Sequence, residues 1–321
     1  MQNWSSSSLA GSDSDLLREL TELFETNTPA LLERARAMAA GKKQILSAPC
    51  ILDGSCQADP PCRHCKWQSL GEGRPESFAK KSIEAAVAHA VKIEGEGIGR
   101  LFLASGWKGY DLPADYYNFV RAIRAAVGME IFGLFGAVNR SSLAQLKAAG
   151  MDGYLCGLES PDEDAYRTFR PAGDTLLSRI QTVRDCRDVG LKIWTGFLYG
   201  FGETEAGVKR ALLFFKELDI DSLSILPFEP FPNTEMEAHD PPNLYRWSRI
   251  VAIAKIFLRD VNVFTSFGAH NMAAYGRSAG ANGFYVVVPP DSANGQAIPL
   301  RADLARAKER ASAAGAPAVS R

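Results

Sequence analysis

Residues 50–67 read CILDGSCQADPPCRHCKW and hold three closely spaced thiols, Cys56, Cys62 and Cys65. Two consecutive prolines in this stretch prevent a strand from continuing and a helix from starting. Soft thiolates select zinc, copper(I) or iron-sulfur clusters. Three thiolates from one loop can hold three irons of a 4Fe-4S cube while the fourth iron stays open to a ligand. The sequence therefore predicts a metal loop, with a cluster as the favoured occupant.

Structural zinc is the main alternative for this loop. Two residues separate Cys62 from Cys65, and His64 or Cys50 could supply a fourth ligand. A zinc knuckle brings its second ligand pair from a similarly spaced turn, whereas the remaining cysteines stand far off and singly. Inert buried thiols are a weaker alternative, and a disulfide framework is disfavoured in a chain of 321 residues without a secretion signal.

The loop resembles the cluster loop of radical S-adenosylmethionine (SAM) enzymes, in which three cysteines bind the cube. The usual family spacing of three and then two residues would place the first ligand at position 58, where this chain has Ala58. With Cys56 as first ligand the spacing is five and then two. That spacing is similar to the HcgA (HmdB) group, implicated in making the guanylylpyridinol cofactor of mono-iron hydrogenase. The resemblance implies Cys56, Cys62 and Cys65 as cluster ligands, and Cys50 remains a competitor for Cys56.

Composition indicates an ordinary soluble globular protein. With 46% hydrophobic and 23% charged residues, the chain can bury a large core as one big domain. A formal net charge of -1 offers no field to attract nucleic acid or an anionic membrane. No apolar run reaches membrane-spanning length, and the polar start lacks the regions of a signal peptide. We therefore expect a cytoplasmic protein, where thiols stay reduced, with neither nucleic acid nor membrane as partner.

Short apolar runs alternate with amphipathic stretches after Lys43, as in consecutive βαβ units with parallel strands. Eight strands are expected near residues 45–48, 100–104, 130–135, 153–158, 192–198, 222–226, 262–265 and 284–288. Helices are expected over 77–92, 114–127, 141–149, 175–189, 205–218 and 243–258. The span is close to that of an eightfold β/α barrel, which has about 250 residues. An open doubly wound sheet would show a similar local sequence pattern.

The resemblance favours closure, because the residues 279–283 before the eighth strand look like the biotin synthase branch of the radical SAM group. The prediction is an α/β protein with a (β/α)8 TIM-type barrel and an N-terminal helical extension. Its expected parts are a disordered start over 1–14, N-terminal helices over 15–43, the barrel over 44–290 and a tail helix over 291–321.

The carboxyl ends of barrel strands carry the reactive groups in such a fold. After the second strand, Ala104, Ser105 and Gly106 resemble the family's Gly-Gly-Glu segment, whose backbone carbonyls receive the amino group of SAM. Trp107 replaces the Glu of that segment, so only a backbone role is implied. An ordinary βα turn is the alternative.

Glu159 ends the fourth expected strand, where the family often places a carboxylate that contacts the SAM ribose or amine. If Glu159 points inward, strand alternation turns Cys156 outward into the core. Arg179, on the following helix, matches an arginine that binds the SAM carboxylate in methylornithine synthase and hydrogenase-maturase relatives, and a guanidinium fork suits a carboxylate. Arg170 is an equal candidate for binding the SAM carboxylate. Alternatively, either arginine lies at the surface without such a role.

The fifth strand runs into residues 195–204, TGFLYGFGET, which look like the family's Gly-x-Ile-x-Gly-x-x-Glu segment. In that segment the backbone of Leu198 would meet the adenine edge of SAM, and His64 or Trp67 could stack near the same ring. Alternatively, Gly200 and Gly202 turn the chain and Glu203 or Thr204 caps the next helix. His270, after the seventh expected strand, could bind substrate or serve a structural role.

The resemblance thus implies one 4Fe-4S cluster and SAM as cofactors. The family reduces SAM at the open iron to a 5'-deoxyadenosyl radical, which takes a hydrogen atom from a small-molecule substrate. An external electron donor, flavodoxin or ferredoxin, is implied as well. The spacing of the cysteines points to biosynthesis of the mono-iron hydrogenase cofactor. Another biotin synthase-like reaction, such as a methylornithine synthase-type rearrangement, and a zinc-stabilised α/β binding protein remain alternatives.

Overall fold

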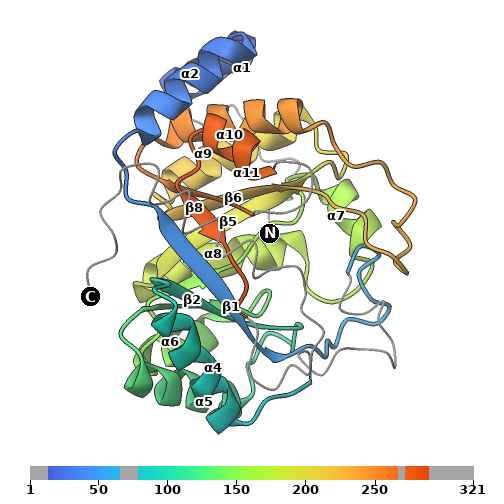
Figure 1. Ribbon diagram of the computed structural model, residues 1–321. Coiled ribbons are helices and arrows are strands. Elements are labelled where there is room, and N and C mark those ends of the chain that lie inside the picture. Colours follow the sequence, from blue (N-terminus) through green and yellow to red (C-terminus); the bar gives the residue numbers. More distant parts are fainter. Residues whose placement is uncertain (1–13, 66–78, 267–271, 289–321) are drawn as a thin grey trace.

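The computed structural model describes residues 14–65, 79–266 and 272–288 (Figure 1). In these residues eight parallel strands close into a barrel in sequence order, with β1 paired to β8. The strands are β1 (Ile45–Asp53), β2 (Arg100–Ser105), β3 (Glu130–Leu134), β4 (Gly153–Leu155), β5 (Lys192–Tyr199), β6 (Ser222–Pro227), β7 (Asn262–Ser266) and β8 (Gly283–Tyr285). The predicted (β/α)8 barrel is confirmed, and the open sheet is not formed.

Helices wrap the outside of the barrel. They are α4 (Ile83–Gly95), α5 (Ala114–Ala126), α6 (Arg140–Ala148), α7 (Glu163–Phe169), α8 (Leu176–Val189), α9 (Glu205–Glu217), α10 (Leu244–Leu258) and α11 (Met272–Ser278). The helix expected from residue 77 is first seen as α4, which begins after Ser82, whose hydroxyl accepts from the Ala85 N–H. The seven-residue helices α7 and α11 were not expected. No helix among the described residues is both long and apolar enough to cross a membrane.

Two helices, α1 (Ser14–Glu25) and α2 (Thr28–Ala39), precede the barrel and flank it next to α10 (Figure 1). They are separated near Asn27, whose side chain accepts from the Ala30 N–H and so caps α2. Arg249 of α10 donates to the carbonyl of Thr26 at 2.5 Å, which ties the end of α1 to the outer layer.

Side chains alternate between the two faces of each strand, as period two requires. On β2, Leu101 and Leu103 pack outward into the large core beneath the helices. Phe102 and Ala104 point inward and join a separate cluster inside the barrel. That inner cluster also contains Phe132, Leu155, Trp194 and Phe264.

Arg100 closes the amino-terminal end of the barrel. Its Nη1 reaches across from β2 to the opposite strand β6 and donates to Ser222 Oγ at 2.9 Å. Its Nη2 lies 2.7 Å from the Glu130 carboxylate, and its guanidinium lies 4.4 Å from the centre of the Phe132 ring. Space for a ligand is therefore left at the carboxyl end of the strands.

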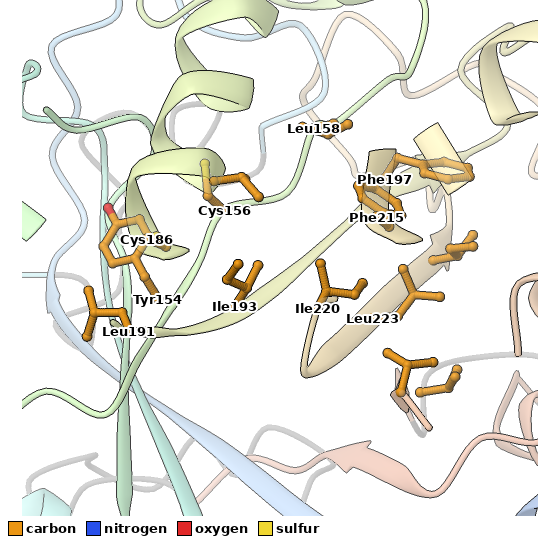
Figure 2. Packing of buried hydrophobic residues seen from close by; sticks show 14 of the residues in the cluster. Tyr154, Cys156, Leu158, Cys186, Leu191, Ile193, Phe197, Phe215, Ile220 and Leu223 are labelled. Carbon is orange, nitrogen blue, oxygen red and sulfur yellow. The ribbon is translucent and has the colours of Figure 1, made fainter. Parts of the chain in front are cut away.

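Three of the six cysteines belong to the core between strands and helices. Cys50 faces outward from β1, with its sulfur 3.9 Å from the Ala86 carbonyl of α4, and burial raises its pKa to about 12. Cys186, on the buried face of α8, lies with Cys156 and Tyr154 between that helix and the barrel (Figure 2). Burial likewise raises the pKa of Cys156 to about 12, so the outward core position predicted for this residue is confirmed.

Candidate functional site

The loop that follows β1 carries the three candidate thiols and begins with a buried ion pair. Lys108 Nζ lies 2.8 Å from Asp53 Oδ2, and their side chains are only 9% and 15% exposed. The same ammonium donates to the Ser55 carbonyl at 2.8 Å. Because a partly desolvated pair holds its geometry better than a surface pair, it fixes the start of the loop over the barrel.

The turn after β2 holds the same loop from the other side. Gln57 N–H donates to the Trp107 carbonyl at 2.9 Å, and Gly106 N–H donates to the Asp53 carbonyl at 3.0 Å. A Cβ on Gly106 would lie 2.1 Å from the Ser55 carbonyl oxygen and 2.8 Å from Cys56 Cβ. Gly106 thus lets two loops touch, and its nearest neighbour is the cysteine loop itself.

Ala104 and Ser105 are buried at the end of β2, and the Ser105 hydroxyl donates to the Gly106 carbonyl at 2.8 Å. These backbone groups lie directly beside the loop that carries Cys56. The turn therefore lies against the cysteine loop, and its backbone role stays a prediction.

Of the three loop thiols, Cys62 is buried and the other two are partly exposed. Cys65 N–H donates to the Cys62 carbonyl at 3.0 Å, which makes a tight turn between them. Burial raises the pKa of Cys62 to about 11, although the positive charge of the nearby Arg170 lowers it in part. Cys50 faces the opposite side of β1 and does not join this group.

The donor set suits an iron-sulfur cluster. In the part of the chain that the structure describes, no three His, Cys, Asp or Glu side chains converge as they would around one ion. A cube takes each thiolate at a different iron, so its cysteines need not meet at one point. Three soft thiolates on one loop fit such a group, beside His64, whose buried Nδ1 has no hydrogen-bond partner among the described residues.

A buried cluster of four charges lies next to the cysteine loop. Glu159 Oε1 is 2.9 Å from Arg179 Nη1 and 3.6 Å from Arg170 Nη1. Asp174, fully buried, lies 2.9 Å from Arg179 Nε through Oδ2 and pairs with Arg170 through Oδ1. The two carboxylates thus balance the two guanidinium groups, and neither arginine lies at the surface.

Asp174 is the residue of this cluster that the sequence did not reveal. It also accepts the Ala137 N–H at 2.8 Å and the Tyr166 hydroxyl at 3.1 Å. Burial alone would raise its pKa, but Arg179 and Arg170 hold that pKa at about 2. Arg179 likewise outweighs burial and lowers the pKa of Glu159. Both carboxylates are therefore ionised.

The barrel opens above this cluster into a cavity of about 360 Å³. Glu159, Arg179 and Leu198 line it together with apolar side chains of the inner wall. Arg170 does not line this cavity, so Arg179 is the better placed of the two arginines for a ligand held there.

Leu198 also lines a second space of about 180 Å³ that it shares with His64. Its N–H donates to the Glu159 carbonyl at 2.8 Å, so its backbone lies next to that residue. The His64 ring lies edge-on to Phe201 at 5.0 Å, and burial lowers its pKa to about 4, so the ring is neutral. Trp67 and His270 lie outside the described residues.

The residues that follow β5 turn the chain and cap the next helix, as the alternative interpretation of this segment predicts. The Glu203 carboxylate accepts from the N–H groups of Gly200 and Phe201 at 2.9 Å. Thr204 caps α9 by accepting from the Gly207 N–H at 3.0 Å. Gly196 is required further back on the strand, because a Cβ there would lie 1.8 Å from the Ser224 carbonyl oxygen.

Solved structures of several enzymes share this fold. The crystal structure of methylornithine synthase (PylB) matches with a TM-score of 0.78 at 18% identity, covering 93% of this chain and 92% of that chain. The FeFe-hydrogenase maturase HydG from Carboxydothermus hydrogenoformans matches with a TM-score of 0.77 at 20% identity, covering 94% of this chain and 78% of that chain.

Sequence relatives agree with this placement. A biotin synthase of Halorhodospira halophila is 26% identical over 283 residues, 84% of this chain and 85% of that protein. An uncharacterized protein of Methanocaldococcus jannaschii is 25% identical over 284 residues, 86% of this chain and 72% of that protein. The profile of the Radical SAM superfamily matches residues 55–215, half of the chain. The protein therefore belongs to the radical SAM superfamily, a family of enzymes that use a 4Fe-4S cluster and SAM.

Proposed function

We propose that Cys56, Cys62 and Cys65 hold the cluster and that the protein cleaves SAM reductively for hydrogen abstraction from a small molecule. Bound together, cluster and SAM supply a 5'-deoxyadenosyl radical. The observation that carries the proposal is the position of three thiols on one loop, held at the carboxyl end of the barrel beside the Glu159–Arg179 pair.

The neighbouring side chains have matching roles in this proposal. Arg179 receives the SAM carboxylate with its guanidinium fork, and Glu159 receives the ribose or amine. The backbone of residues 104–106 and the carbonyl of Leu198 face the remaining polar groups of SAM, and His64 lies close to its adenine ring. Asp174 and Arg170 orient the Glu159–Arg179 pair from behind, and the apolar barrel wall keeps water away from the reacting atoms.

For the pathway, the five-then-two cysteine spacing supports biosynthesis of the guanylylpyridinol cofactor of mono-iron hydrogenase. Other biotin synthase-like reactions share the fold, so this step rests on the loop alone. One cluster is proposed, because the remaining cysteines, Cys50, Cys156 and Cys186, are each buried in the core. Flavodoxin or ferredoxin in the cytoplasm would supply the electron.

Ligand identity is tested by a matched pair of variants. Cys56→Ala should lose most of the iron and the electronic spectrum of the anaerobically reconstituted protein, because one corner of the cube loses its ligand. Cys50→Ala should keep both, since that thiol faces α4. The reverse pattern would overturn the ligand assignment. One zinc per chain in place of iron and sulfide would leave only a zinc-stabilised scaffold.

The reaction is tested with dithionite and SAM under anaerobic conditions. The reconstituted protein should form 5'-deoxyadenosine and methionine. If neither product appears although the cluster is full, the proposed reaction is wrong. Transfer of deuterium from labelled candidate substrates into 5'-deoxyadenosine then separates pyridinol assembly from the other reactions of this branch.

A further inference from the structure

The deep end of the barrel cavity carries two hydroxyl groups with an uneven hydrogen-bond balance. Ser224 of β6 and Tyr285 of β8 both line the cavity, and their oxygens are 2.6 Å apart. The indole Nε1 of Trp194 donates to the same Ser224 oxygen at 2.8 Å. The Thr195 hydroxyl, also on the wall, is already used by the Cys156 carbonyl at 2.7 Å.

The hydrogens of this group can be counted. Trp194 can only donate, so the Ser224 oxygen must accept from it. The single contact between Ser224 and Tyr285 uses one hydroxyl hydrogen, whichever residue donates. Within the described residues neither oxygen has another partner. One hydroxyl hydrogen of the pair is thus left for a ligand in the cavity.

Neighbouring rings hold this donor in place. Trp194 stacks on Tyr285 with ring centres 5.5 Å apart and an angle of 15°. Phe264 also packs against Trp194, with ring centres 4.1 Å apart, and Arg100 closes the barrel beneath. Burial raises the pKa of Tyr285, so its phenol stays protonated at neutral pH. A donor held by packed rings is preorganised for recognition.

We propose that the Ser224–Tyr285 pair is the polar end of the substrate site and binds a hydrogen-bond acceptor on a small, otherwise apolar substrate. A carbonyl oxygen, a hydroxyl oxygen or an aromatic ring nitrogen fits this chemistry. The rest of the substrate lies against apolar side chains such as Phe102, Leu155 and Leu226. Its far end then points toward Glu159 and Arg179, where SAM is proposed to bind, so the inference rests on the proposed function.

The proposal is tested with two small ligands of similar shape, acetophenone and isopropylbenzene, of which only the first carries an acceptor. Their dissociation constants are measured by ligand-observed NMR on the anaerobically reconstituted protein with SAM and without reductant. The measured quantity is the ratio of the isopropylbenzene constant to the acetophenone constant. A lost hydrogen bond of about 1.4 kcal/mol corresponds to a tenfold change in this ratio.

Tyr285→Phe keeps the ring that stacks on Trp194 and leaves the Ser224 hydrogen for the ligand, so it should lower the ratio less than the loss of both hydroxyls. Ser224→Ala/Tyr285→Phe removes both hydroxyls and should lower it about tenfold. Tyr275→Phe, at an exposed tyrosine of α11, should leave it unchanged. A ratio in the double variant within twofold of wild type would overturn the proposal. If the double variant does not fold, Ser224→Cys/Tyr285→Phe, whose thiol is only a weak donor, is measured in its place, and a ratio within twofold of wild type overturns the proposal.

Absence of binding of either ligand to the wild-type protein at millimolar concentration also overturns the proposal. Because no reductant is present, the measurement does not depend on SAM cleavage. Formation of 5'-deoxyadenosine with dithionite is measured separately on the same preparations. Failure of the substrate assignment and failure of the proposed reaction are therefore distinguishable.

Discussion

Single residues decide how closely the loops of this site approach one another. Gly106→Ala is expected to lower the free energy of unfolding by about 1–3 kcal/mol, the usual range for overpacking. The added Cβ would lie 2.1 Å from a backbone oxygen of the cysteine loop, so backbone must move. Urea denaturation measures the loss, and iron content after reconstitution should fall with it because Cys56 lies on the displaced side.

Gly99→Ala is the matched control, because a Cβ on Gly99 would meet no atom within 4 Å. It should leave the unfolding free energy and the iron content near wild type. Equal behaviour of the two variants would contradict the role given to close approach at Gly106.

Asp174 gives a pH dependence whose sign follows from its low pKa. The two arginines hold the folded-state pKa at about 2, below the ordinary 3.8, so its stabilisation is present above about pH 4 and is lost as the pH falls toward 2. The contribution is about 2 kcal/mol. Asp174→Asn lacks it and should be less stable at pH 6, with the difference from wild type shrinking toward pH 3.

Urea titrations across that pH range measure the shrinking difference. Asp164→Asn, at an exposed position on α7, is the control and should show a small difference at every pH. A pH-independent difference for Asp174→Asn would show that the carboxylate does not titrate as its arginine partners require.

At this scale the sequence identified groups whose chemistry is unusual and overlooked groups whose chemistry is common. Clustered thiols have few uses, so Cys56, Cys62 and Cys65 could be singled out. Asp174 stands one position before a helix-capping threonine, where an aspartate attracts no notice. Its role depends on Arg170 and Arg179 meeting in space, which spacing along the chain does not show.

Among the elements, α8 places Arg179 in its first turns and depends on its amino-terminal cap. Thr175 accepts from the Ser178 N–H at 3.1 Å, and Ser178 Oγ accepts from the Thr175 N–H at 2.9 Å. Thr175→Ala should cost about 1 kcal/mol of stability, and Thr175→Ser should restore it. Urea denaturation checks both, and a loss shared by the serine variant would point to the methyl group instead of the cap.

Element prediction succeeded where a periodic pattern was long enough to read. The outer helices α5, α8, α9 and α10 and all eight strands lie where alternation indicated them. Helices α7 and α11 have seven residues each, two turns that show no clear apolar period. Strand β4 ends at Leu155, while the next residues still bond to β5 through the Cys156 and Leu158 N–H groups.

Closure of the barrel is a property of the whole molecule that the local sequence pattern does not predict. Residues 45–47 of β1 pair with residues 283–285 of β8, more than two hundred positions apart. Gly283 fits at this seam because a Cβ there would lie 2.5 Å from the Phe264 ring. The same local pattern suits an open sheet, so the closed form was favoured by resemblance alone and then found in the structure.

Arg100 tests whether the barrel is held together from within. Arg100→Met keeps the length of the side chain but removes its bonds to Ser222 on the opposite strand and to Glu130. We expect a loss of about 1–3 kcal/mol, as for lost hydrogen bonds to a charged group, because Glu130 is one-third exposed and keeps Lys192 as a partner. Urea denaturation measures it, and Arg18→Met, at an exposed arginine of α1, should change stability by less than about 0.5 kcal/mol.

A double variant separates two causes of the loss: the missing hydrogen bonds of Arg100 and the Glu130 carboxylate that has lost this partner. Arg100 is only 5% exposed, so its removal leaves Glu130 with Lys192 as its remaining partner. Arg100→Met/Glu130→Gln should therefore recover part of the loss, because the neutral amide no longer needs a cation at this half-buried position. If Arg100→Met alone stays within about 1 kcal/mol of wild type, apolar packing of the inner rings suffices to hold β2 against β6, and the cross-barrel bond is dispensable.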